Sequence, residues 1–239
     1  MNKLALVLTL MAAAPAASSW AKSPVAATVT DIKGRPQVKG QGQSFRSLRR
    51  QDSVYEGDVI KTGSGELAAL AFLGGVELRI NANSNFTVQS GGRGQEPPSV
   101  FTTLGQAWTR LLHGKGGGMQ VRTPVAVCSV RGTEADVEMG ERMMVKVYEG
   151  LVDVANDKGA QSLRAGQLTQ VASADSAPQA PKSMDQGDYG TWQNSLKPED
   201  TAKAMERLNR EAAKNRTLEL EMDDKDGKKK KIKLNFEKK

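Results

Sequence analysis

The sequence contains a single cysteine, Cys128, a single histidine, His113, and few aromatic residues, which make up 5% of its 239 residues. One cysteine cannot form an intramolecular disulfide, so a hydrophobic core has to hold the fold together. One histidine and one cysteine do not supply the ligands of a His/Cys zinc site. Few aromatic residues and 24 glycines are typical of many short strands joined by tight turns, and not of a long helical bundle.

Only one long apolar run occurs, Leu4–Ala17 at the start of the chain, and Lys3 precedes it. Ser19-Trp20-Ala21 places small residues at the two positions that a signal peptidase reads. We therefore predict a signal peptide over residues 1–21, cleaved after Ala21, and a periplasmic or secreted protein. The alternative is an uncleaved membrane anchor, but the run is shorter than the roughly 20 residues that span a bilayer. No cysteine lies directly after the run, which excludes a lipoprotein anchor.

The net charge of +7 is unevenly distributed. From Lys197 to the C-terminus there are 14 basic and 10 acidic residues, whereas residues 22–196 are nearly neutral. Export argues against nucleic acid as a partner, and the basic tail fits anionic lipid, lipopolysaccharide or a cell-wall polymer. Four consecutive lysines, Lys228, Lys229, Lys230 and Lys231, could contact such a surface. The alternative is a solvated turn whose lysines protect an edge strand from aggregation.

Residues 22–172 show the pattern of an all-β domain. Glu66–Phe72 is apolar on both faces, which indicates a buried strand, and Val76, Leu78 and Ile80 alternate with polar residues. Turn residues recur every 8–12 positions along this region. We predict short antiparallel strands arranged as a sandwich or a solenoid-like stack, and strand periodicity alone does not separate these two.

A different composition follows this domain. Residues 173–197 begin with the Ser/Ala/Pro-rich stretch "SADSAPQAPKSMDQ" and are predicted to form a linker. Residues 198–239 are predicted to form a helix over Pro198–Asn215 and then a β-hairpin around Asp226-Gly227. In that hairpin Glu219 and Glu221 would face the lysine-rich returning strand.

No motif in the sequence predicts an enzyme, a metal site or a cofactor. Cys128 lies in an apolar run and is predicted to be a buried side chain with a raised thiol pKa rather than a nucleophile. "GKGGG" at 114–118 lacks the ending of a phosphate-binding loop. "DDKDG" at 223–227 lacks the downstream glutamate of a calcium loop. No spacing of carboxylates supports a hydrolase.

Two stretches together resemble a FecR domain, and the resemblance covers about residues 26–172. "VYEGDVIKTGSGELAALAFLGGVELRINANSNFTV" resembles its first half, and "VRTPVAVCSVRGTEADVEM" begins its second half. The motif residues are Thr123, Pro124, Arg131, Gly132, Thr133, Gly150 and Gly166.

The resemblance implies an extracytoplasmic all-β domain. The best-known members of the family are inner-membrane regulators whose cytoplasmic segment controls a sigma factor and which receive a signal from an outer-membrane receptor. Only three residues precede the apolar run in this sequence, so we expect the free-standing, exported type. That type would be a binding or scaffolding module at the cell envelope, with an unknown protein or an envelope polymer as partner. The alternative is a component of a FecR-type signalling system whose cytoplasmic part is supplied elsewhere. Candidate binding segments are Gln89–Ser99 and Leu112–Gly118.

Arg131 raises a separate question, because a charged side chain next to a buried strand needs a partner. We expect an internal carboxylate or carbonyl group rather than a bound ligand, and hence a lower melting temperature on Arg131→Ala. Gly132 is predicted to allow a bend before the next strand segment.

Overall fold

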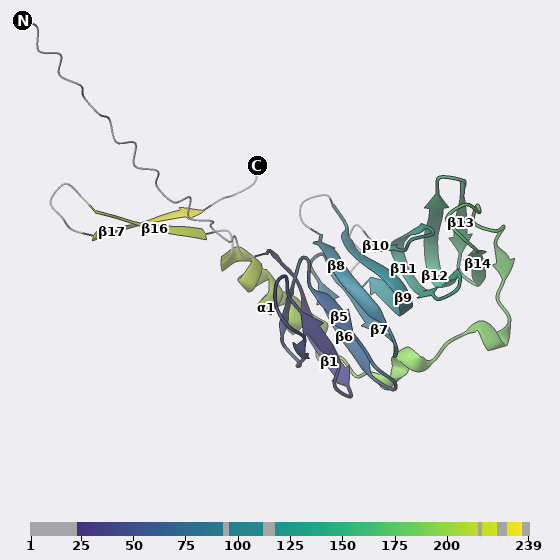
Figure 1. Cartoon of the computed structure of the whole chain (residues 1–239), viewed down its shortest axis with the longest axis horizontal. Coiled ribbons are helices and arrows are strands. Elements are labelled where there is room, and N and C mark those ends of the chain that lie inside the picture. Colours follow the sequence, from purple (N-terminus) through teal and green to yellow (C-terminus); the bar gives the residue numbers. More distant parts are fainter. Residues whose placement is uncertain (1–22, 93–95, 112–117, 215–216, 224–228, 236–239) are drawn as a thin grey trace, which may run out of the picture.

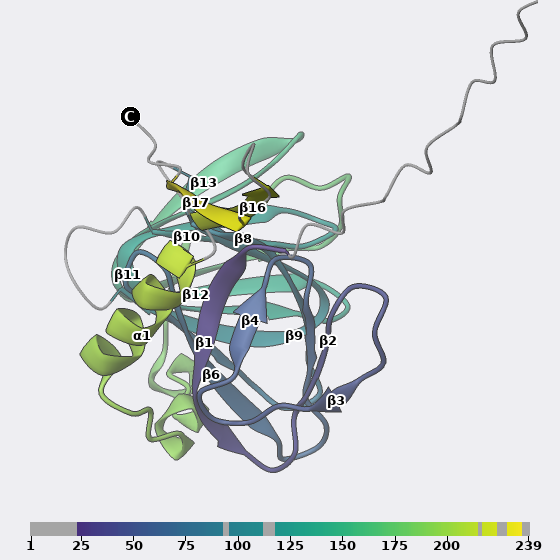
Figure 2. The same cartoon turned by 90° about the vertical axis from the view of Figure 1, so that its left-hand side faces the viewer.

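The structure, a computed structural model, describes residues 23–92, 96–111, 118–214, 217–223 and 229–235. The predicted signal peptide, His113 and Lys228 lie outside these ranges. The prediction of an all-β fold is confirmed, because most of the chain forms strands and fifteen of them make one sheet. This sheet is neither a plain sandwich nor a stack, since it closes into a five-stranded barrel with extra strands. Figure 2 shows the strands curving around the interior.

The first half of the sheet consists of short strands. β6 is buried at all six positions, as its apolar sequence predicts, and it lies between β1 and β7. The strands of this half are β1 (Val25–Lys33), β2 (Gln37–Lys39), β3 (Arg46–Ser47), β4 (Ser53–Tyr55), β5 (Val59–Lys61), β6 (Leu67–Phe72), β7 (Val76–Ile80) and β8 (Asn85–Gly91).

The second half contains three strands of 13 or 14 residues, longer than the sequence predicts. Glu149-Gly150, a pair whose glycine predicts a turn between two strands, is instead a bend within the continuous strand β12. β10 pairs with β11 in antiparallel fashion but with the beginning of β9 in parallel. The strands are β9 (Pro98–Leu111), β10 (Met119–Arg122), β11 (Val127–Met139), β12 (Met143–Asn156), β13 (Gly159–Arg164) and β14 (Gln167–Val171).

The segment predicted as a linker, residues 173–197, follows the surface of the domain (Figure 1). The backbone N–H of Gln179 donates to the carbonyl of Gln170, and that of Met184 donates to the carbonyl of Gly166. We call residues 182–197 the strap. It contains β15 (Lys182–Ser183) and the 3-10 turns η1 (Gln186–Asp188) and η2 (Trp192–Ser195). The strap crosses from β14 back toward β1, so the sheet has a covered outer face as well as a core.

The predicted helix is present as α1 (Thr201–Lys214) and lies against β1 and β6 (Figure 2). The helical sequence has an apolar stripe of Ala202, Met205, Leu208 and Ala212. As this stripe predicts, Leu208 is buried with Val25 and Leu73, and Met205 packs on the same cluster. The C-terminal hairpin is also present, as β16 (Thr217–Asp223) and β17 (Lys229–Asn235). Its register pairs Glu219 with Lys233 and Glu221 with Lys231, so the acidic and basic strands do face each other.

Candidate functional site: the strap-covered face of the sheet

The Thr-Pro motif forms the turn between β10 and β11. The Thr123 hydroxyl donates to the carbonyl of Ala126 (2.9 Å) and accepts the N–H groups of Val125 (3.3 Å) and Ala126 (3.1 Å). Thr123 is buried and Pro124 is exposed. These residues therefore close a tight turn, and the threonine side chain replaces backbone partners there.

Gly132, Gly150 and Gly166 all have positive φ, at 62°, 76° and 77°. Gly132 and Thr133 together lie opposite Gly150, because Arg131 pairs with Leu151 and Glu134 with Glu149. Both β11 and β12 change one of their neighbouring strands at this bulge. The first part of β11 pairs with β10 and the second part with β9, while β12 passes from β14 to β13. A residue with positive φ permits such a bend at low cost only if it is glycine.

Arg131 is exposed rather than buried. Its guanidinium lies 3.5 Å from the Asp153 carboxylate, so the expected internal partner exists, but 69% of the arginine side chain remains accessible. An exposed pair of this kind stabilises a fold by about 0–1 kcal/mol. Arg131 also borders a hollow of about 320 Å³, together with Pro97, Met119, Gln120, Ser129 and Val130.

The other predicted residues do not gather into one site. Cys128 is buried, and burial raises the pKa of its thiol, as predicted. Lys229, Lys230 and Lys231 are described only as backbone of β17, and Lys228 lies outside the described residues. Of the two candidate binding segments, Gln89–Gly91 and Pro98–Ser99 belong to β8 and β9, and residues 93–95 and 112–117 fall outside the described part.

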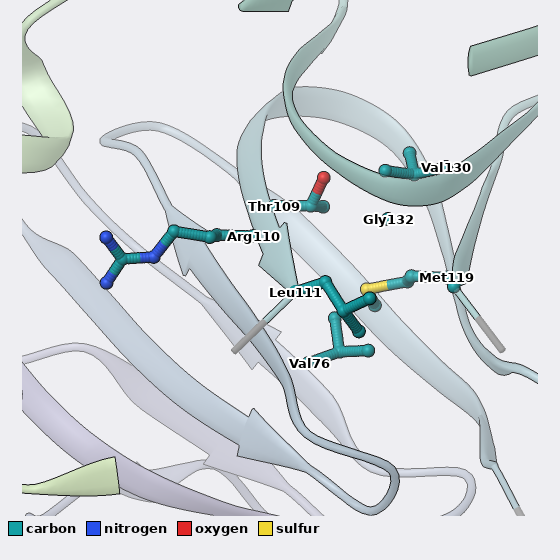
Figure 3. Close-up of a pocket in the computed structure, with 8 residues that line it drawn as sticks. Val76, Thr109, Arg110, Leu111, Met119, Val130 and Gly132 are labelled. Atoms are coloured by element: carbon teal, nitrogen blue, oxygen red, sulfur yellow. The ribbon is translucent and has the colours of Figure 1, made fainter. Parts of the chain in front are cut away.

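A small apolar cavity of about 10 Å³ lies where β7, β9, β10 and β11 meet. Met119, Leu111 and Val76 point toward one another there, whereas the guanidinium of Arg110 points away (Figure 3). The cavity has room for about one water molecule and presents no polar surface to it. Among the described residues, no three metal-ligating side chains come together.

A row of polar side chains crosses the outer face of the central strands. The register places Arg79 of β7 beside Trp108 of β9, Trp108 beside Asp136 of β11, and Asp136 beside Lys146 of β12. The Arg79 guanidinium stacks on the Trp108 ring at 4.7 Å from its centroid. This row lies beneath the strap, although the alternating sequence of β7 predicts that Arg79 is solvated.

A second row of side chains lies on the same face, two residues further along each strand. Ion pairs hold this row together. Glu77 is buried and accepts from Arg79 Nε (2.6 Å) and Arg110 Nη2 (3.0 Å). Glu134 accepts from the Trp108 indole N–H (2.9 Å). The carboxylates in this row therefore have partners within the sheet itself, and they do not need the strap.

Asp136 is a buried carboxylate of this face that contacts the strap directly. It is 2% exposed, and its Oδ2 accepts from Gln106 Nε2 (2.7 Å) and from the indole N–H of Trp192 (3.3 Å). Desolvation raises the pKa of Asp136 from 3.8 to about 7, against the lowering effect of Trp192, Lys146 and Gln106. Its other oxygen, Oδ1, is buried and has no hydrogen-bond partner. A buried polar atom without a partner costs about 1–3 kcal/mol.

The charged and titratable groups around Asp136 come from three elements. Tyr148 lies on a bulge of β12, since Glu149 pairs with Glu134 and Val147 with Ala135, and its hydroxyl is 3.4 Å from Asp136 Oδ2. Bulges re-aim side chains next to functional sites. Desolvation and the nearby Asp136 charge raise the pKa of Tyr148 to about 12. The charged neighbours are Lys146 of β12, Glu134 and Glu138 of β11, and Asp188 of the strap, which pairs with Lys146.

The sequence does not predict that this face of the sheet is covered by another segment. In the sequence Glu134, Asp136 and Glu138 alternate with Ala135, Val137 and Met139, which predicts one polar and one apolar side of a strand. The alternation does not indicate that Asp136 is buried. One available signal was the pair of aromatic residues Tyr189 and Trp192 inside a segment otherwise composed like a linker. A disordered linker has little reason to carry them.

Comparison with known proteins finds the family that the sequence resembles, over a shorter range than residues 26–172. Residues 58–153 match the family model described as FecR protein. The chain contains a FecR domain. The matched residues begin at Asp58, before β5, and end within β12, so the strap and α1 lie outside the match. No curated protein matches the sequence.

Two solved structures are similar to this chain. Both are crystal structures of a candidate anti-sigma factor from Parabacteroides distasonis ATCC 8503, at 1.65 and 2.50 Å resolution. Each has a TM-score of 0.47 and 22% sequence identity, over 53% of this chain. The chain spans 60% of the length of those proteins.

Proposed function

We propose that this protein is a FecR-type signalling component that acts outside the cytoplasm by binding another protein. The FecR domain over residues 58–153 carries the proposal. The N-terminal apolar run followed by Ser19-Trp20-Ala21 supports export. Among the described residues, no helix is both long and apolar enough to cross a membrane.

Binding, rather than catalysis, fits the side chains of the domain. The only thiol of the chain is buried and its pKa is raised, which suppresses the thiolate that a nucleophile needs. The carboxylates of the outer face are engaged with arginine, tryptophan and glutamine side chains. Such a surface can recognise a partner through charge and hydrogen bonds.

The signalling role is tested by deleting the gene in its host and measuring all transcripts. We expect a small group of promoters that share one sigma factor to change together, and the wild-type chain to restore them. An unchanged transcript profile with a more permeable envelope would instead favour a scaffolding module at the cell envelope, the second candidate. The lysine-rich C-terminal strand β17 favours that candidate, because it suits an anionic lipid or lipopolysaccharide surface.

Export is tested separately by intact mass measurement of the protein from fractionated cells. We expect a mature chain that begins at Lys22 and is recovered in the soluble extracytoplasmic fraction. A chain that begins at Met1 and stays in the membrane fraction would show an uncleaved anchor.

A further inference from the structure

The strap covers a surface that is already polar. Beneath it lie the two rows of charged and aromatic side chains described above, most of them paired within the sheet. The apolar part of the contact is small: Trp192 and Leu196 pack against Leu67 and Ala69, and the Tyr189 ring lies 5.7 Å from the Tyr148 ring, centroid to centroid. Removing the strap would therefore expose mainly groups that water can solvate, and the barrel core would stay covered.

The strap is held as a peptide ligand is held. Trp192 and Leu196, four residues apart, provide the side-chain anchors. Side chains of the sheet contact the main chain of the strap at four points: Arg79 Nη1 donates to the Gln193 carbonyl (2.6 Å), Lys146 Nζ donates to the Asp188 carbonyl (2.9 Å), the Tyr148 hydroxyl accepts the Gly190 N–H (3.2 Å), and Asp31 Oδ2 accepts the Lys197 N–H (2.6 Å). Main-chain hydrogen bonds combined with a few side-chain anchors are a recurrent mode of peptide recognition.

Some buried polar atoms at the contact between the strap and the sheet lack a hydrogen-bond partner. Two of the four buried side-chain atoms without a hydrogen-bond partner among the described residues belong to it, Asp136 Oδ1 on the sheet and Gln193 Oε1 on the strap. Permanent cores rarely leave buried polar atoms unpaired. When the strap lifts, both atoms gain access to water, and this access favours opening.

We propose that this outer face is a binding surface for a protein segment that carries a tryptophan and a leucine four residues apart, and that the strap occupies it in the free chain. A partner segment of this kind binds by displacing residues 185–197. The inference goes beyond the signalling role and does not depend on it, because it concerns what the face binds and not what the binding controls.

The strap is covalently connected to the sheet. This connection explains why the strap, and not a separate segment, occupies the outer face in the free chain. A tethered segment acts at an effective concentration in the millimolar range, so a free segment with the same contacts cannot compete at micromolar concentration. A variant with a weakened strap leaves the face available. The face should then accept the same sequence when it is added as a separate peptide.

The test uses the full chain and a fluorescent synthetic peptide with the sequence of residues 185–197. Wild type is compared with Trp192→Ala and Leu196→Ala, and Asn194→Ala is the matched control, because Asn194 is an exposed residue of the same strap. We expect the peptide to bind both anchor variants saturably and at least about ten-fold more weakly to wild type and Asn194→Ala. A peptide with alanine in place of both anchors should not bind.

Three results would overturn the proposal. The first is no peptide binding to either anchor variant when circular dichroism shows that the variant is folded. The second is equal binding of the peptide that lacks both anchors, since the binding would then be unspecific. The third is unfolding of both anchor variants, because a segment that the fold requires cannot be displaced by a partner.

Discussion

Gly132 and Gly150 lie opposite each other on the paired strands β11 and β12, and both have positive φ, 62° and 76°. Each strand changes its second partner at this point, β11 from β10 to β9 and β12 from β14 to β13. The Arg-Gly-Thr and Glu-Gly motifs thus mark one corner of the sheet. The corner orients the segment that carries Asp136 and Tyr148 on the outer face.

Alanine at either glycine should destabilise the domain. The space around Gly132 is open, so the cost comes from the backbone conformation, about 1–2 kcal/mol for an L-residue with positive φ. We expect Gly132→Ala and Gly150→Ala each to lower the melting temperature by several degrees, as measured by calorimetry. Gly140→Ala at the β11–β12 hairpin tip is the matched control, because that site is open and its φ is not positive. Equal melting temperatures for all three variants would contradict the role of the corner.

Arg131→Ala should leave stability almost unchanged. The sequence predicts a loss, but the structure places the side chain in solvent, 3.5 Å from Asp153. We expect the free energy of unfolding in urea to change by less than about 0.5 kcal/mol. A loss of several kcal/mol would show that Arg131 has a buried partner after all.

Asp136→Asn should remove a pH dependence of stability. The folded-state pKa of Asp136 is raised to about 7, so the folded chain binds more protons than the unfolded chain between about pH 4 and pH 7. The stability contributed by the protonated form is therefore lost as the pH rises through this window. We expect the variant to be more stable than wild type at pH 8 and to show a flatter profile of unfolding free energy against pH. A wild-type chain that gains stability from this group as the pH rises would contradict the assignment.

Cys128 should be unreactive in the folded protein. The thiol is buried in the barrel core, and burial raises its pKa. We expect a thiol reagent such as Ellman's reagent to label it only after unfolding in denaturant. Stoichiometric labelling of the native protein within seconds would reopen the question of a reactive cysteine.

Much of the fold could be predicted from sequence because local rules determine it. β6 follows from an uninterrupted apolar run, α1 from its apolar stripe, and the β16–β17 register from alternating charges around a turn. The bends at Gly132 and Gly150 are harder to predict from the sequence. Glycine permits a turn and a bulge equally well, so only the sheet pairing shows that Glu149-Gly150 lies within a continuous strand.

The candidate site could not be predicted, because it forms through contacts across long sequence separations. Trp192 reaches Asp136 over 56 residues, and Arg79 reaches Gln193 over 114. Alternation correctly places Arg79 and Asp136 on the side opposite the core. Whether that side faces water depends on the path of the strap, and the composition of residues 173–197 predicts only a linker.

The claim that the strap can be displaced is tested most directly by native-state hydrogen exchange on the unmodified wild-type chain. We expect the amides of Gly190 and Leu196, which donate to the Tyr148 hydroxyl and the Gln193 carbonyl, to exchange through local opening. Their exchange should be much faster than that of buried β11 amides such as Val137, and should depend little on low concentrations of denaturant. Exchange of the strap amides at the rate of the β11 amides, with the denaturant dependence of global unfolding, would show that the strap opens only when the whole domain unfolds.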